Sequence, residues 1–136
     1  MKFGLTMKLG VAALSFTMCL FAIETFAEYQ TAMKTAAGAN GAIRKNLEGD
    51  LAAVASAAME MKTAFAEIEK YWAAKNVADG QEFAQNIQKA ADEIHAAAKA
   101  GNREQATAAA KSVGASCQGC HAAHRDKGPD GAFVIK

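Results

Sequence analysis

Apolar residues recur at alternating intervals of three and four along most of the chain beyond residue 28. This spacing is typical of amphipathic helices that pack side by side at shallow angles. It predicts four helices joined by short polar or glycine-containing segments. The clearest inward-facing stripe belongs to the second helix, which Asp50 precedes as a predicted N-cap. That stripe consists of Leu51, Val54, Ala58, Met61, Phe65, Ile68 and Trp72.

The first helix is predicted from about Tyr29 to Leu47 and has a less regular pattern. Gly38 and Gly41 lie inside it, and each costs about 1 kcal/mol relative to alanine in a helix interior. They mark the close approach of a flat cofactor or a neighbouring helix, or else a plain packing contact. The inward-facing stripe of this helix consists of Tyr29, Met33, Ala36, Asn40, Ile43 and Leu47.

The segment from Asn76 to Gly80 interrupts the period and predicts a loop before the third helix. Gly101 is expected to end that helix, and Asn102 to cap the fourth with Gln105 in a capping box. The connection is so short that these two helices should run antiparallel. The third stripe consists of Phe83, Ile87, Ala90, Ile94 and Ala98, and the fourth of Ala106, Ala110, Val113, Cys117, Cys120 and His124.

Composition agrees with this pattern. Alanine is abundant, β-branched residues are sparse and Pro129 is the single proline, which favours an all-α domain. The predicted fold is therefore an antiparallel four-helix bundle, and the tail from Asp126 to Lys136 is expected to be irregular. The net charge of +1 gives no reason to expect nucleic acid or an anionic membrane surface as a partner. No catalytic triad, phosphate loop or paired carboxylates are visible, so an enzyme is not predicted.

The first 27 residues have the pattern of a cleaved signal peptide. A short basic start precedes an apolar run from Leu9 to Ile23, and Thr25-Phe26-Ala27 forms a small-residue cleavage site. The mature domain is therefore predicted to cover residues 28–136, with no membrane span left after cleavage. An uncleaved anchor is the alternative, but the apolar run is shorter than the ~20 residues that a spanning helix needs. Cys19 would be discarded with the leader.

The sequence Cys117-Gln118-Gly119-Cys120-His121 is a C-x-x-C-H motif, which is the attachment site of a c-type haem. On a helix, residues three and four apart share one face, so both thiols can form thioethers while His121 turns toward the iron. Haem is attached to such thiols outside the cytoplasm, where a signal peptide sends the chain. The motif and the leader together predict one covalent haem c.

Three other interpretations of the two cysteines remain. They could form a structural disulfide, a redox pair of thioredoxin type, or half of a zinc site completed by His121 or His124. A thioredoxin-like pair should lie beside a strand in a βαβ pattern, and no such pattern is visible. A closed zinc site needs four ligands, whereas Cys19 lies in the leader and His95 is remote in the sequence.

The mature chain resembles the class II cytochromes c, the family that includes cytochrome c′. The resemblance depends on the C-x-x-C-H motif near the C-terminus with Arg125 four residues after His121. Looser support comes from the Tyr-x-x-x-Met segment at Tyr29 and Met33 and from the short Gly-Asn turn before the last helix. The chain departs from the family at His124, where relatives often have tyrosine, and at Gln30, where they usually have arginine.

The resemblance implies a haem lodged between the helices of a periplasmic protein. Cys117 and Cys120 match the thioether positions, His121 the axial ligand, and Arg125 a basic residue near the haem propionates. Met33 matches the methionine that completes six-coordinate iron in the electron-transferring members. The chain is then expected to carry single electrons between periplasmic redox proteins. The family also allows a homodimer paired through the first two helices.

The alternative implied by the family is five-coordinate iron with an apolar distal site that binds nitric oxide or carbon monoxide. Met33 would then be a packing residue. Four other conspicuous positions are predicted to be structural. Met61 should fill core volume, His95 should be a partly exposed structural histidine, and Tyr71 and Trp72 should close the end of the bundle.

Overall fold

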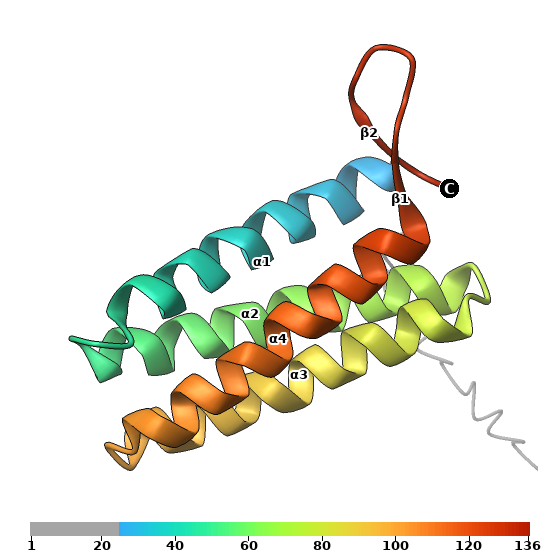
Figure 1. Ribbon diagram of the computed structural model, residues 1–136. Coiled ribbons are helices and arrows are strands. Elements are labelled where there is room, and N and C mark those ends of the chain that lie inside the picture. Colours follow the sequence, from blue (N-terminus) through green and yellow to red (C-terminus); the bar gives the residue numbers. More distant parts are fainter. Residues whose placement is uncertain (1–24) are drawn as a thin grey trace, which may run out of the picture.

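The computed structural model describes residues 25–136, which form four helices and a C-terminal hairpin (Figure 1). The predicted all-α antiparallel four-helix bundle is confirmed, and the small hairpin is an addition to it. Residues 1–24 of the predicted leader, including Cys19, lie outside the described residues. The helices are α1 (Phe26–Asn46), α2 (Leu51–Ala74), α3 (Ala78–Lys99) and α4 (Arg103–His124), and the strands are β1 (Arg125–Lys127) and β2 (Phe133–Ile135).

The capping residues behave largely as the sequence predicts. The carboxylate of Asp50 accepts hydrogen bonds from the backbone N–H groups of Ala52 and Ala53 at 2.9 and 3.1 Å. Gly101 has a φ of +72°, the left-handed conformation that ends helices most easily at glycine. The side chain of Asn102 accepts a hydrogen bond from the Gln105 N–H at 3.0 Å. Local hydrogen bonding therefore determines the ends of these helices.

α1 begins three residues before the predicted start at Tyr29. A capping box explains the difference, because the Thr25 hydroxyl accepts from the Glu28 N–H and the Glu28 carboxylate accepts from the Thr25 N–H, both at 3.2 Å. Cleavage after Ala27 would remove this cap. α1 of the mature chain would then begin at Glu28.

The prediction of a loop up to Gly80 is wrong, because α3 already begins at Ala78. Gly80 is buried in the first turn, where an added Cβ would lie 2.6 Å from Cδ2 of Trp72. The missing side chain thus lets this turn pack directly on the indole ring. A glycine that looks like a loop signal is here a packing position.

The prediction of an irregular tail is also wrong. β1 and β2 pair antiparallel, and the turn between them is closed by a hydrogen bond from the Gly128 N–H to the Ala132 carbonyl at 2.8 Å. Gly131 adopts a φ of +78° in this turn, a conformation that favours glycine. The aromatic and β-branched run Phe133-Val134-Ile135 is a typical strand sequence. These local preferences together specify a hairpin.

The core lies along the inner faces of the four helices. α2 packs on both α1 and α3, and α3 packs on α4 (Figure 1). Apart from the adjoining residues and the nearby backbone of α1 itself, nothing in the described residues lies within 4 Å of a Cβ placed on Gly38 or Gly41. The predicted close approach of a neighbouring helix at these glycines is therefore wrong. The largest fully buried side chains are Trp72, Ile43, Met61, Ile68, Ile87, Ile94, Val54 and Val113.

Within residues 25–136, none of the helices is long and apolar enough to cross a membrane.

Candidate functional site

A pocket of about 430 Å³ lies between α1 and α4, at the end of the bundle where α1 begins and α4 ends. Its volume is within the range of roughly 300–1,000 Å³ found for small-molecule and cofactor sites. The α1 wall includes Tyr29, Gln30, Met33, Ala36, Ala37 and Asn40. The α4 wall consists of Cys117, Cys120, His121 and His124, and the remaining lining comes from Phe26, Lys34, Met61, Phe65, Ile87, Arg125, Phe133, Val134 and Ile135.

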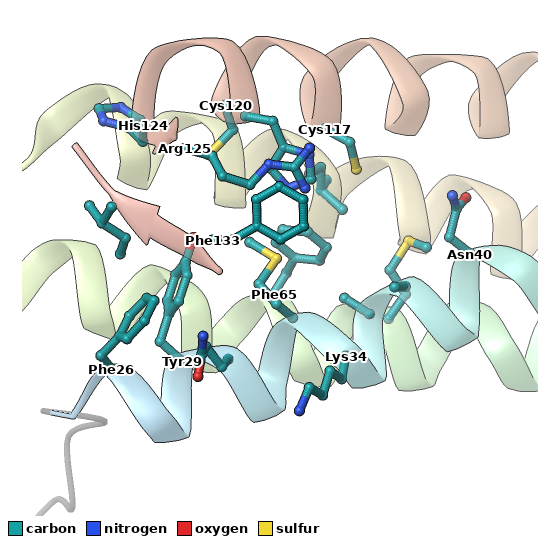
Figure 2. Close-up of a pocket in the computed structure, with 18 of the residues that line it drawn as sticks. Phe26, Tyr29, Lys34, Asn40, Phe65, Cys117, Cys120, His124, Arg125 and Phe133 are labelled. Atoms are coloured by element: carbon teal, nitrogen blue, oxygen red, sulfur yellow. The ribbon is translucent and has the colours of Figure 1, made fainter. Parts of the chain in front are cut away.

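The two motif cysteines both reach this pocket from α4 (Figure 2). Cys120 is 5% exposed and Cys117 is partly buried, and the two sulfurs are not bonded to each other. Burial raises the pKa of Cys120 to about 11 and also raises the pKa of Cys117. Reactive cysteines of redox pairs have lowered pKa values, so these neutral thiols do not resemble a thioredoxin-type pair.

His121 lines the same pocket, one residue after Cys120. Burial lowers the pKa of this imidazole below its ordinary value, and the positive charge of Arg125 lowers it further. Both effects favour the neutral imidazole, which is the form that binds a metal ion. The surroundings of His121 therefore favour the protonation state in which its imidazole can bind a metal ion.

Gly119 explains how the motif is seated on its neighbouring helix. A Cβ at this position would lie 2.7 Å from Cε1 of Phe83 on α3, closer than real contacts allow. The glycine therefore lets α4 approach α3 at the middle of the motif. Phe83 is partly buried in this contact, rather than part of the buried core as its predicted place on the inner stripe implied.

Met33 lies in the wall opposite the motif and is partly buried against the core. Met61 of α2 also lines the pocket and is fully buried, so it fills core volume as predicted while its side chain borders the cavity. Met59 is 40% exposed and is not among the lining residues. The described residues thus bring two methionines, Met33 and Met61, to one cavity with both thiols and His121.

His124 lines the pocket but its ring is held by other groups. Its Nε2 lies 2.9 Å from Oδ2 of Asp79, and its ring centroid lies 4.8 Å from that of Trp72. Asp79 belongs to the first turn of α3, so this contact ties the end of α4 to the start of α3. A structural role accounts for His124.

His95 is also structural, as predicted. It is partly buried, and its Nδ1–H donates to the backbone carbonyl of Ala55 at 3.1 Å, which joins α3 to α2. Tyr71 and Trp72 pack against Tyr29 at the end of the bundle. The ring centroids are 4.4 Å apart for the tilted pair Tyr29 and Tyr71, and 5.5 Å apart for the edge-to-face pair Tyr29 and Trp72. The predicted closure of this end by aromatic residues is confirmed.

Arg125 lies at the mouth of the pocket, at the junction of α4 and β1. Its guanidinium carbon lies 4.2 Å from the centre of the Phe133 ring, and Figure 2 shows both side chains between α4 and α1. Within residues 25–136, no carboxylate forms an ion pair with Arg125. The contact of its guanidinium within these residues is therefore with the Phe133 ring at the pocket mouth.

Sequence reasoning missed the contribution of the hairpin to this site. Phe133, Val134 and Ile135 all line the pocket, although the tail was expected to be irregular. A usable signal was present, because the turn residues Gly128-Pro129-Asp130-Gly131 precede a short aromatic and β-branched run. That signal predicts a hairpin but does not tell where the hairpin packs.

The donor set fits a covalently held haem. Two neutral thiols, a neutral imidazole and a thioether border one largely apolar cavity, and a cation lies at its mouth. A closed zinc site is not supported in the described part of the chain, where no group of three or more His, Cys, Asp or Glu side chains could hold a metal ion. Haem iron needs only one or two protein ligands.

Comparisons of the chain with protein-family models, curated proteins and solved structures found no match. The resemblance to the class II cytochromes c therefore stays a prediction from the residues.

Proposed function

We propose that this protein is a periplasmic monohaem c-type cytochrome that acts as a one-electron carrier. Cys117 and Cys120 would hold the haem covalently, and His121 and Met33 would bind its iron. The observation that carries the proposal is that these four side chains border one pocket between α1 and α4. Met33 lies 84 or more positions before the three motif residues in the sequence, and a single flat cofactor in this pocket could reach all four side chains.

The rest of the pocket supports the same proposal. Ala36, Ala37 and Ile87 contribute apolar surface to the lining of the cavity, which suits the hydrophobic faces of a haem. Arg125 at the mouth is positioned for charge-assisted hydrogen bonds to propionate groups. When bound, haem supplies the exchange of one electron at iron. The chain orients the haem through the thiols and the imidazole, and a thioether ligand favours the reduced state.

Haem attachment is tested by mass spectrometry and haem staining of the exported, mature protein. We expect one haem per chain that survives denaturation, and a weaker or absent haem stain for Cys117→Ala and Cys120→Ala. His95→Ala is the matched control, because this histidine joins α2 to α3 away from the pocket and should leave attachment unchanged. A wild-type chain made with a maturation system that carries no haem would contradict the proposal.

The sixth ligand is tested by comparing Met33→Leu with Met61→Leu, which nearly conserve side-chain volume. Met33→Leu is expected to convert low-spin iron to high-spin and to open a site for carbon monoxide. Met61→Leu should leave the spectrum unchanged, although Met61 borders the same cavity. The reverse result would assign the ligand to Met61.

The alternative function is a five-coordinate cytochrome that binds nitric oxide or carbon monoxide. The alanines beside Met33 favour it, because Ala36 and Ala37 supply no hydrogen bonds to a bound gas. The same absorption spectrum decides between the two functions. High-spin iron in the wild-type protein that binds carbon monoxide directly would favour gas binding.

The proposed partners are other periplasmic redox proteins, and no reaction on a bound substrate is proposed. Export after removal of residues 1–27 would place the mature chain in the periplasm. A homodimer paired through α1 and α2 is part of the proposal and can be tested by sedimentation of the mature protein.

A further inference from the structure

The C-terminal hairpin covers part of the pocket mouth in a specific arrangement. Phe133 of β2 lies between α4 and α1, beside Arg125 (Figure 2). Ile135 packs partly buried against the helical core, and the Lys136 N–H donates to the His124 carbonyl at 3.1 Å. The end of the chain thus returns to the end of α4 and places three side chains over the cavity.

The hairpin is specified in detail rather than left loose. The Gly131 N–H donates to the Gly128 carbonyl at 2.9 Å, and the Asp130 side chain accepts from the Ala132 N–H at 3.0 Å. An added Cβ at Gly128 would lie 3.3 Å from Val134, so the turn is closely packed. Holding these residues in one conformation costs conformational entropy, and a loosely attached tail would not incur that cost. The contacts of the hairpin with the pocket offset part of this cost.

The same hairpin is weakly held compared with the helices. Its strands have three residues each, and two-stranded hairpins of this kind are marginally stable in water. Phe133 is 48% exposed, and two cations lie over its ring, the Arg125 guanidinium at 4.2 Å and the Lys127 ammonium at 6.0 Å from the ring centre. Elements with few buried contacts open locally at low free energy. The hairpin therefore has the properties of a cover that opens without unfolding the bundle.

We propose that the hairpin is a gate over the haem pocket and that Phe133 determines which external ligands reach the iron. This inference rests on the proposed function, because it concerns access to the haem site. The closed hairpin slows entry through the mouth beside Arg125, and it slows bulky ligands more than diatomic ones. The gate thus keeps the iron with its own ligands during electron transfer.

The gate is tested on the haem-bearing protein in a Met33→Ala background, where the iron can bind external ligands directly. Association rates of carbon monoxide and n-butyl isocyanide are measured for Phe133→Ala and for Gly131→Val. The first variant removes the ring, and the second strains the turn at its positive φ without touching the pocket. Met59→Ala is the control, because this side chain is similarly exposed at 40% but lies outside the pocket.

Both hairpin variants are expected to raise the isocyanide rate by roughly tenfold or more, the factor for an open state populated at about 10% or less. The carbon monoxide rate should rise less, and Met59→Ala should change neither rate. Haem-bearing variants with unchanged rates would overturn the gate alone. A Met33→Ala chain that carries no haem would instead overturn the proposed function and the gate with it.

Discussion

The α2–α3 side and the α1–α4 side of this bundle have the same helical period but pack differently. Between α2 and α3, large side chains such as Trp72, Ile68 and Ile94 fill the space completely, each 1% exposed or less. Between α1 and α4, the side chains leave a pocket of about 430 Å³. The comparison teaches that a shared helical period does not by itself decide whether two neighbouring helices close on each other or frame a cavity.

The residues of the motif belong to both regions. Gly119 fits α4 tightly against Phe83 of α3, while Cys117 and Cys120 turn toward the open side. At the far end of the bundle the Arg103 guanidinium donates to the Leu47 carbonyl, which ties the start of α4 to the end of α1. The packed interface between α3 and α4, together with the hydrogen bond between Arg103 and Leu47 at the far end, can thus hold the pocket open for a cofactor.

The largest expected difference between the two sides is in packing energy. Ile94→Ala should lower the free energy of unfolding by about 2–5 kcal/mol, because the side chain is fully buried in a filled core. Met33→Ala in the same haem-free protein should cost less than about 1 kcal/mol, since Met33 borders a cavity. Urea denaturation of both variants measures the difference. Equal losses would mean that the open side is packed as tightly as the closed one.

Alkaline pH should destabilise the open side through its thiols. Burial raises the pKa of Cys120 from 9.0 to about 11, so the folded state keeps a proton that the unfolded state loses. The free energy of unfolding of the reduced, haem-free chain should therefore fall by roughly 2 kcal/mol as the pH rises from about 9 to about 11. Unfolding curves across this range measure the loss.

Cys120→Ser is the control for this pH dependence. The variant should lose less stability over the same range, while any contribution from the tyrosines remains in both chains. An identical pH dependence in the two chains would show that the Cys120 thiol is not buried in the folded state.

Replacing a glycine by alanine should change the free energy of unfolding in opposite directions on the two sides of the bundle. Gly80→Ala forces a Cβ against Trp72 and should cost about 1–2 kcal/mol after the gain in helix propensity. The Cβ added by Gly38→Ala on α1 meets no neighbouring element of the described chain within 4 Å, so this change should stabilise the protein by up to about 1 kcal/mol. Thermal unfolding compares them. Stabilisation by both would show that the contact between Trp72 and α3 is loose.

The smallest change in the free energy of unfolding is expected at the surface ion pair that joins the start of α3 to the end of α4. Asp79→Ala removes the partner of His124 and should cost about 0.5 kcal/mol, because the carboxylate is half exposed. Asp92→Ala is the matched variant on the closed side, where Asp92 pairs with Lys62 at 2.8 Å. Chemical denaturation should give similar small losses. A loss of several kcal/mol for Asp79→Ala alone would show that His124 is essential for the end of α4.

Several features could be predicted from the sequence because they depend on neighbouring residues. The helical stripes follow from spacing along the chain, and Asp50, Gly101 and Asn102 act on backbone groups within a few residues. The predicted core of α2 is buried from Val54 to Trp72 along the expected stripe. The motif cysteines were assigned to one face of a helix for the same reason.

Other features could not be predicted because they depend on distant residues. Gly80 reads as a loop residue until Trp72 is placed above it, and the local signals for the hairpin do not show that Phe133 and Ile135 line the pocket. Met33 and Asn40 lie on the expected stripe of α1, yet they border the pocket and stay partly exposed. The spacing of a stripe does not show which of its positions meet a partner.

The sequence by itself determined four amphipathic helices, most of their ends and the candidate haem-attachment motif, since each follows from interactions within a few turns of chain. Only the tertiary structure decided that α1 stands apart from α4, that Met33 shares a pocket with Cys117, Cys120 and His121, and that the hairpin covers its mouth. The physical reason is that a cavity depends on the summed volumes of side chains from several helices.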